Sequence, residues 1–407
     1  MSLQLITIMT AGAGLALVGL VHNSYTAYFM VAAVVALLLV SYIVSRLPTR
    51  GLTWRRYARD RVFEDELFPV TVELTNRGRL PRFLMTVVDT LPPFVESDEL
   101  QEAVLPALWP SQQVKFSYQV RALKRGVYPL GPLRISVSDP FGLFPRFVPF
   151  EARDEAIVYP RRVPLGGEAA RSGLEFRGIT AGERARAAES GMEFYGVRDY
   201  RSGDELRRIH WPATARHGQL TVIEFDRGAS GDLAVLLDTK AGTEFGRGVE
   251  TTLEVGVRAA ASLIHWALEN EGAGLLTADS ESGPRWLEVD RLDREHEALE
   301  MLARVQANGT RRISEMLAWA APRLPRGTKV FVLTAAPDED LPGVVQSLRR
   351  QQVRLHVVVV DPHGFDLRVE RPEAMLDALQ AAGAVTVDLR RDDDLAEAIG
   401  SVLVGSD

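Results

Sequence analysis

The residues best suited to chemistry lie in one segment, Phe194–Asp226, which reads FYGVRDYRSGDELRRIHWPATARHGQLTVIEFD. It contains five arginines, five acidic residues, one tryptophan and two of the seven histidines of the chain. These residue types could form a catalytic centre, a binding surface or a polar clamp between domains. Guanidinium groups bind carboxylates bidentately, so the arginines can clamp the acids of the same segment. The candidate pairs join Arg198 or Arg207 to Asp199 or Asp204.

An enzyme centred on Arg198–His217 is the alternative that we weigh against binding. It would use His210 or His217 as a general base, with Asp204 to orient the imidazole. No recognisable nucleophile setting accompanies these residues, because the chain has no Gly-x-Ser-x-Gly, Ser-x-x-Lys, His-Glu-x-x-His or phosphate-loop motif. A nucleic-acid surface is not expected either, since acids alternate with the arginines and the net charge is −7.

The interpretation that we favour is a domain clamp or a protein-binding surface, and we predict no catalytic residue. Tryptophan and arginine are enriched at the residues that contribute most to protein interfaces. The residues predicted for this role are Arg198, Asp199, Tyr200, Gly203, Asp204, Arg207, Arg208, Trp211 and Arg216. The pattern leaves open which of them act within the chain and which face a partner.

Two uncharged apolar runs, Leu3–Val21 and Ala27–Val44, open the chain. Each approaches the roughly 20 residues that cross a hydrocarbon core of ~30 Å. We predict a transmembrane hairpin over residues 1–46, with a signal peptide as the other interpretation of the first run. The small residues Gly12, Ala16 and Gly19 would allow the two helices to approach closely.

The arginines after the hairpin predict its orientation. The connector between the runs has no lysine or arginine, whereas six arginines lie between Arg46 and Arg61. The positive-inside rule therefore places the soluble domains in the cytoplasm. Trp54 and Tyr57 would lie at the level of the lipid headgroups, so the lipid bilayer is one expected partner. The absence of cysteine excludes disulfides and cysteine ligands.

The soluble chain divides into three parts. Residues 51–160 alternate apolar and polar residues between Gly and Pro turns, as in PVTVELTN, which predicts an antiparallel β-sandwich-like domain. Residues 161–231 hold a linker and the arginine-rich segment. Residues 232–407 alternate apolar strands with helical patterns, which predicts a doubly wound α/β domain. In such folds ligands bind at the carboxyl ends of the strands, here at Asp238, Thr334 and Asp361.

The whole chain resembles the bacterial "domain of unknown function 58" family. The resemblance rests on RGVYPLGPLRISVSDPFGLF and on YGVRDYRSGDELRRIHWPATARHGQLTVIEFD. It implies a von Willebrand factor A-like α/β domain and a multi-pass protein of the bacterial inner membrane. It also implies work with a MoxR-type AAA+ ATPase in the assembly or maturation of envelope or secreted proteins. The family usually has Asp where this chain has His210, which weakens any role for a carboxylate there.

The resemblance also implies positions for a Mg²⁺ site, which this sequence has largely lost. The family fold often carries Asp-x-Ser-x-Ser, a distant Thr and an Asp after a later strand, all of them hard oxygen ligands. The corresponding positions here are Asp238, Lys240, Gly242, Thr310 and Ala335. We therefore predict a degenerate site with no bound metal, and no cofactor. Either the Lys240 ammonium lies against Asp238 in place of the cation or Lys240 is a solvated loop residue.

Overall fold

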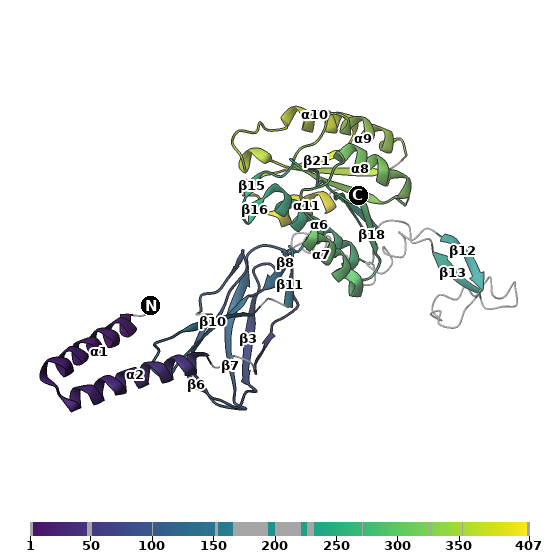
Figure 1. Cartoon of the computed structure of the whole chain (residues 1–407). Helices are drawn as coiled ribbons and strands as arrows, with labels where there is room; N and C mark the ends of the chain where they lie inside the picture. The colour runs from purple at the N-terminus through teal and green to yellow at the C-terminus, as the bar shows by residue number, and fades with distance from the viewer. Residues whose placement is uncertain are drawn as a thin grey trace. The chain divides into compact units, whose positions relative to one another are not determined.

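The computed structural model describes residues 3–46, 51–99, 101–150, 154–165, 194–199, 221–225, 232–270, 272–325, 327–351 and 353–404. The chain forms two compact units, Met1–Tyr159 and Pro160–Asp407. Pro160–Leu165 therefore belongs with the second unit, where the backbone N–H of Val163 donates to Ser262 Oγ at 2.9 Å. Figure 1 shows the elements of both units along the chain.

The first unit begins with two apolar helices, α1 (Leu3–His22) and α2 (Tyr25–Arg46). Both are long and apolar enough to cross a membrane, which confirms the two predicted helices. They pack closely at small residues, because a Cβ atom at Gly12 would lie 3.3 Å from Val34 and one at Gly19 would lie 3.3 Å from Tyr28. Glycine at these positions is what allows the two helices to come together.

Two four-stranded antiparallel sheets follow, with strand orders β1-β3-β7-β5 and β10-β9-β4-β6. Val70, Val72 and Leu74 of β3 are at most 1% exposed, as their alternation predicts, and pack in one core with residues of the second sheet. A three-stranded sheet has the order β2-β11-β8. The strands are β1 (Leu52–Tyr57), β2 (Arg61–Phe63), β3 (Leu67–Asn76), β4 (Arg82–Asp89), β5 (Val95–Glu96), β6 (Glu102–Leu108), β7 (Gln113–Ala122), β8 (Gly126–Leu130), β9 (Leu133–Ser138), β10 (Arg146–Phe150) and β11 (Asp154–Tyr159).

The second unit contains a six-stranded sheet of order β18-β17-β14-β19-β20-β21, which is parallel except for the antiparallel edge strand β18. Helices α8, α9 and α10 share a buried core with one face of this sheet. Helices α6, α7 and α11 lie on the other face (Figure 1). In α6, apolar residues at spacings of three and four, from Leu253 to Leu268, form a stripe that is buried against the sheet.

The strands of this unit are β12 (Phe194–Asp199), β13 (Thr221–Phe225), β14 (Leu233–Leu237), β15 (Gly246–Arg247), β16 (Glu250–Thr251), β17 (Gly274–Ala278), β18 (Arg285–Val289), β19 (Lys329–Thr334), β20 (Arg354–Val360) and β21 (Val385–Leu389). The helices are α6 (Thr252–Glu269), α7 (Glu295–Arg304), α8 (Ile313–Ala320), α9 (Leu341–Arg349), α10 (Glu373–Ala382) and α11 (Leu395–Val404). Short 3₁₀ turns lie at Leu292–Arg294, Ala321–Arg323 and Pro362–Gly364.

A buried ion pair joins the two sheets of the first unit. The Arg56 guanidinium of β1 donates to both oxygens of Asp89 at the end of β4, at 3.0 and 2.5 Å. The Tyr118 hydroxyl of β7 donates to the same carboxylate at 2.7 Å. The Arg56 and Asp89 side chains are only 1% and 2% exposed. Removing Asp89 would leave the buried Arg56 guanidinium with the Leu130 carbonyl at 2.6 Å and the more distant Asp154 carboxylate at 3.8 Å, which replace the lost ion pair only in part.

We therefore expect Asp89→Ala to lower the free energy of unfolding by about 3–5 kcal/mol. The effect is measured by heating the detergent-solubilised chain and recording the temperature at which a protease begins to cut within residues 52–159. Asp98→Ala, at an exposed carboxylate of the same unit, is the matched control. Equal melting temperatures for the two variants would contradict this role for the Asp89 pair.

Candidate functional site

The candidate site lies at the carboxyl edge of the parallel sheet, where β14 and β19 are neighbours. From β14 the chain continues to β17 on one side, whereas β19 leads to β20 and β21 on the other. The strand order therefore reverses between β14 and β19, which is where α/β sheets of this kind bind their ligands. Asp238 follows β14 and Thr334 ends β19, so both predicted edge residues lie at this point.

Both oxygens of Asp238 accept hydrogen bonds from within the chain. Thr334 Oγ1 donates to Oδ2 at 2.7 Å, and the backbone N–H of Lys240 donates to Oδ1 at 3.1 Å. Asp238 is 8% exposed. Its burial raises the pKa of the carboxyl group, which the hydrogen bonds from Thr334 and Lys240 oppose. The edge thus holds a carboxylate whose protonated form the fold favours.

The cavity beside Asp238 is too small for a substrate. It has a volume of about 10 Å³ and is lined by side chains such as Thr243, Thr252 and Thr334. A space of this size holds about one water molecule. Ligand pockets for small molecules usually enclose ~300–1,000 Å³. The geometry around Asp238 therefore does not support a small-molecule site at that point.

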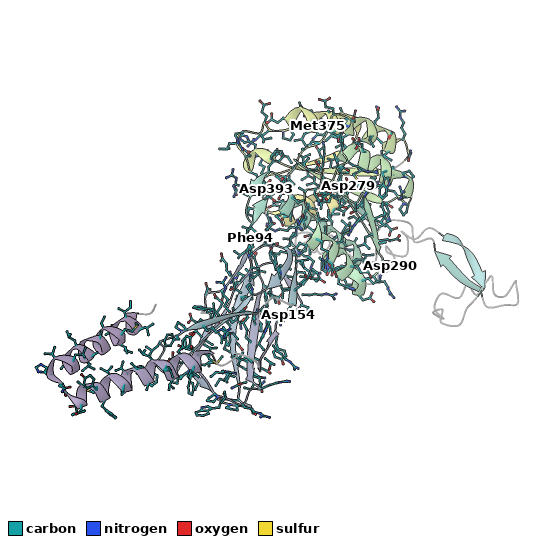
Figure 2. The ribbon with its side chains drawn as sticks, viewed as in Figure 1. Phe94, Asp154, Asp279, Asp290, Met375 and Asp393 are labelled. Carbon is teal, nitrogen blue, oxygen red and sulfur yellow. The ribbon has the colours of Figure 1, made fainter. Side chains whose placement is uncertain are left out.

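A second buried carboxylate, Asp279, follows β17 and fastens two loops together (labelled in Figure 2). Its Oδ2 atom accepts hydrogen bonds from the backbone N–H groups of Thr310 and Arg311, at 2.8 and 2.9 Å. Its own backbone exchanges two hydrogen bonds with Thr239 Oγ1, at 2.8 and 3.0 Å. Asp279 is 3% exposed, and its Oδ2 atom acts as an internal acceptor that orders the edge, whereas its buried Oδ1 atom has no hydrogen-bond partner among the described residues.

Gly309 lets these loops approach one another. Its N–H donates to the Thr239 carbonyl at 2.7 Å, and its own carbonyl accepts from Ala241 N–H at 2.8 Å. A Cβ atom at position 309 would lie 2.9 Å from that Thr239 oxygen and 3.1 Å from Asp279 Oδ2. The position has no room for a side chain, so the glycine is required by close backbone contact.

The positions implied for a Mg²⁺ site do not form a donor set that suits this ion. Both Asp238 oxygens already accept hydrogen bonds, Ala335 is apolar and 8% exposed, and Thr310 is bonded to Asp279. Gly242 brings no side-chain ligand. Mg²⁺ needs several oxygen ligands in near-octahedral geometry. Across the described ranges, no group of three His, Asp or Glu side chains is arranged to hold a metal.

Lys240 contacts Asp238 through its backbone and not through its ammonium group. The N–H of Lys240 donates to Asp238 Oδ1, and the chain next to it pairs with Gly309 in an isolated parallel bridge. Among the residues that the structure describes, no ion pair within 4.0 Å joins Lys240 to Asp238. Backbone and hydroxyl donors therefore satisfy this carboxylate.

Asp361 and Asp338 complete the same pattern along the edge. Asp361 Oδ1 accepts from His363 N–H at 3.0 Å after β20, as expected for a predicted strand-end residue. Asp338, in the loop after β19, accepts from the N–H groups of Ser314 and Asp340, at 3.0 and 3.2 Å. Each loop of the edge is thus held by a carboxylate that caps backbone donors.

The arginine-rich segment is described only in its flanks. Strands β12 and β13 pair antiparallel, with Arg198 opposite Val222 and Asp199 opposite Thr221. The other predicted residues, Tyr200, Gly203, Asp204, Arg207, Arg208, Trp211 and Arg216, lie outside the described residues, as do His210 and His217. Both the clamp and the enzyme interpretation of this segment therefore stay predictions.

Sequence reasoning missed Asp279, Thr239 and Gly309. A signal for Asp279 was present, since the runs LLTAD, VLLD and VVVVD each end a buried strand on an aspartate.

A polar cluster in the second unit was also missed. There the Arg162 guanidinium contacts both Glu295 oxygens at 2.7 Å, and His265 Nδ1 lies 2.9 Å from Glu295 Oε1.

Comparison with known proteins identifies the family of the second unit. The family described as "Protein of unknown function DUF58" matches residues 196–395. These residues make up just under half of the chain, and over them the chain is similar to the DUF58 family. The match begins within the arginine-rich segment and includes all six strands of the α/β sheet, whereas the predicted resemblance also covered the first unit, which this match does not include.

A relative of this chain is the uncharacterized protein YeaD of Bacillus subtilis (strain 168). It is 25% identical over 265 residues, and the match spans 64% of each chain, less than two thirds of YeaD. Similar solved structures include a CARDB domain from Pyrococcus furiosus, 15% identical with a TM-score of 0.18, over 26% of this chain and 91% of that chain. Another is trypsin-activated alpha-2-macroglobulin from Escherichia coli, 15% identical with a TM-score of 0.20, over 39% of this chain and 9% of that chain. At these TM-scores neither structure carries an argument about this one.

The raised pKa of Asp238 predicts a pH-dependent stability. The folded chain holds the Asp238 proton more tightly than the unfolded chain, so stability falls as the pH rises from about 4, the ordinary pKa of aspartate, through the raised pKa. Asp238→Asn should lose this part of the pH dependence. Melting temperatures between pH 4 and pH 8 measure it, with Asp392→Asn at an exposed carboxylate as control. Parallel profiles for wild type and Asp238→Asn would contradict the assignment.

Replacing Asp279 should loosen the edge. Asp279→Ala leaves the N–H groups of Thr310 and Arg311 without their acceptor, at a cost of about 1–3 kcal/mol for each donor. Asp279→Asn keeps one oxygen and should cost less. Urea unfolding of both variants measures the difference, with Glu281→Ala at an exposed neighbour as control. Two variants as stable as the control would show that Asp279 does not fasten these loops.

Proposed function

We propose that this protein is a membrane-anchored, cytoplasm-facing scaffold that binds a protein partner through the carboxyl edge of its α/β unit. The observation that carries the proposal is the internal use of the edge carboxylates. Asp238, Asp279 and Asp338 accept hydrogen bonds from other segments of the same edge, which supports a role for these groups in holding the shape of the edge. A pre-ordered set of loops binds a partner with a smaller loss of conformational entropy.

The two apolar helices support the membrane anchor. Their length and composition suit a transmembrane hairpin, and the six arginines that follow favour the cytoplasmic side of a bacterial inner membrane. The rest of the chain covers only 11% of each apolar span. Exposure of so much apolar surface is costly in water and favourable in lipid. A multi-pass protein with cytoplasmic soluble units is therefore the arrangement that we propose.

The strand order of the second unit supports the finer expectation of a von Willebrand factor A-like domain. One edge strand is antiparallel, and the order reverses between β14 and β19. The resemblance to the family implies that this domain works with a MoxR-type AAA+ ATPase in the assembly or maturation of envelope or secreted proteins. We propose such an ATPase as the partner, with no nucleic acid and no cofactor involved.

The edge carries charged side chains that a protein partner can contact. Arg312 is about half exposed and lies 3.1 Å from Asp340, which is 70% exposed. Arg311 precedes it in the loop that Asp279 fixes. Since an exposed ion pair contributes little to stability, Arg312 and Asp340 can be changed with little risk to the fold, and the half-buried Arg311 needs a check by circular dichroism. They are therefore suitable probes of binding.

Co-purification from native membranes tests the proposal. We expect a tagged wild-type chain to recover an AAA+ ATPase, and the variant Arg311→Glu/Arg312→Glu to recover at least about tenfold less, as for loss of an interface hot spot. The matched control is Arg349→Glu/Arg350→Glu, two exposed arginines at the end of α9. The control should recover as much ATPase as the wild type.

A third variant, Arg207→Ala/Trp211→Ala, tests the arginine-rich segment in the same experiment. Loss of the ATPase from this variant alone, with unchanged circular dichroism, would move the binding surface from the sheet edge to that segment. Recovery of no ATPase by the wild type would contradict the proposed partner. An activity screen centred on Arg198–His217 would then test the hydrolase alternative.

A further inference from the structure

The end of helix α2 is fastened to the β-rich part of the first unit. Ser41 Oγ donates to Asp139 Oδ2 at 2.8 Å, and these residues are 1% and 0% exposed. The rings of Tyr42 and Phe144 meet edge-on, with centroids 5.7 Å apart. The last turns of α2 therefore pack on the loop Asp139–Phe144.

Asp139 also holds the shape of that loop. Its two oxygens accept the backbone N–H groups of Phe141 and Phe144 at 3.0 and 2.9 Å. Since a buried carboxylate with several donors is costly to rearrange, the loop and α2 form one fixed connection. The position of α2 in a membrane then sets the depth of the loop.

The length of α2 places this connection at the membrane surface. The apolar span runs over 21 residues, Tyr25–Ser45, or about 32 Å of helix. Only sixteen residues of α2 precede Ser41, about 24 Å, which is shorter than a hydrocarbon core of ~30 Å. The docked turn therefore lies at the end of the apolar span, so the strands beside it would lie next to the headgroup layer of a membrane that α2 crosses.

The surface around this turn is apolar and basic. Val44 and Ser45 of α2 line a cleft of about 20 Å³ together with Pro81, Arg82, Phe83, Val137, Ser138 and Arg146. Phe147 and Phe141 beside it are 72% and 55% exposed, and Leu80 and Leu84 are 45% and 41% exposed. Exposed phenylalanine and leucine side chains can insert at the boundary between the headgroups and the acyl chains of a membrane.

The charge of this surface has one sign. Residues 77–88 and 140–147 contain Arg77, Arg79, Arg82 and Arg146 and no acidic residue. Arg77, Arg79 and Arg146 are exposed, and the N–H of Arg77 donates to the Gly51 carbonyl, five residues after the end of α2, at 2.7 Å. Arginine near a membrane surface is attracted to anionic lipid and binds phosphate through its planar donors.

We propose that the surface formed by residues 77–84 and 140–147 lies on the bilayer and binds anionic lipid headgroups. We call it the headgroup surface. The proposal rests on the membrane anchor proposed above, and it adds a lipid-binding site outside the hairpin. Phe141 and Phe147 enter the interface, while Arg77, Arg79 and Arg146 contact headgroup phosphates. The first unit is then held against the membrane along a face and not by α2 alone.

Single-cysteine labelling of the full chain tests the headgroup surface, because the chain has no cysteine of its own. In the variant Phe147→Cys, the introduced cysteine is labelled with a polarity-sensitive fluorophore. The labelled chain is then placed in vesicles whose lipids bear a nitroxide quencher at headgroup level. The matched control is Phe94→Cys, an exposed phenylalanine at the end of the β-rich part far from α2 (labelled in Figure 2). We expect strong quenching at position 147 and little at position 94.

A second comparison varies the charge of the lipid and the number of arginines on the headgroup surface. Quenching at position 147 should be stronger in vesicles that contain phosphatidylglycerol than in phosphatidylcholine alone. Arg77→Gln/Arg79→Gln/Arg146→Gln should remove that difference, since each arginine accounts for about a fivefold change in attraction to an anionic surface. An undiminished difference in this variant would overturn the role of the arginines.

An alkaline carbonate wash, which removes proteins that are not inserted in the bilayer, shows whether a negative result concerns the headgroup surface or the membrane anchor. If the chain leaves the vesicles, the anchor and the headgroup surface are both overturned. If the chain stays and position 147 is quenched no more than position 94, the anchor holds and the headgroup surface is overturned. A label at position 147 that is shielded from water but not quenched by lipid would show that protein covers this surface, which also overturns the proposal.

Discussion

Buried carboxylates that accept backbone N–H groups are the interaction on which the rest of this structure depends. A carboxylate removed from water is costly unless donors surround it, so each such group fixes the loops that supply its donors. Asp238 and Asp279 do this where the sheet order reverses, and Asp139 does it where α2 meets the β-rich part. The same device therefore orders both candidate surfaces of the chain.

The donors around Asp238 explain why this edge does not suit a divalent cation. A divalent cation would need the oxygens that Thr334 Oγ1 and the Lys240 N–H already use. The later position that would bring a further carboxylate is Ala335, which is buried and apolar. With the oxygens of Asp238 occupied by internal donors, the edge keeps ordered loops and exposed side chains such as Arg312. Rigid loops with exposed charges favour the recognition of a protein partner.

The sequence was sufficient for the elements but not for the contacts between them. Short apolar runs predicted the strands of the parallel sheet, and spacings of three and four predicted the buried face of α6, because burial imposes these periods locally. The edge strand β18 was not predicted, since its residues are mostly exposed or half-buried and form no compact apolar run. Ser41 and Asp139 are 98 residues apart and Arg162 and Glu295 are 133 apart. No local pattern pairs residues at such separations.

Hydrogen exchange of the sheet edge, with and without Mg²⁺, tests the central claim most directly. The amides of Lys240, Thr310 and Arg311 donate to the carboxylates of Asp238 and Asp279, and hydrogen-bonded amides exchange only when the structure opens. The account predicts slow exchange in peptides that cover residues 238–243 and 309–312, unchanged by Mg²⁺. Fast exchange without the ion that becomes slow when Mg²⁺ is added would contradict it, and would show that a metal orders this edge.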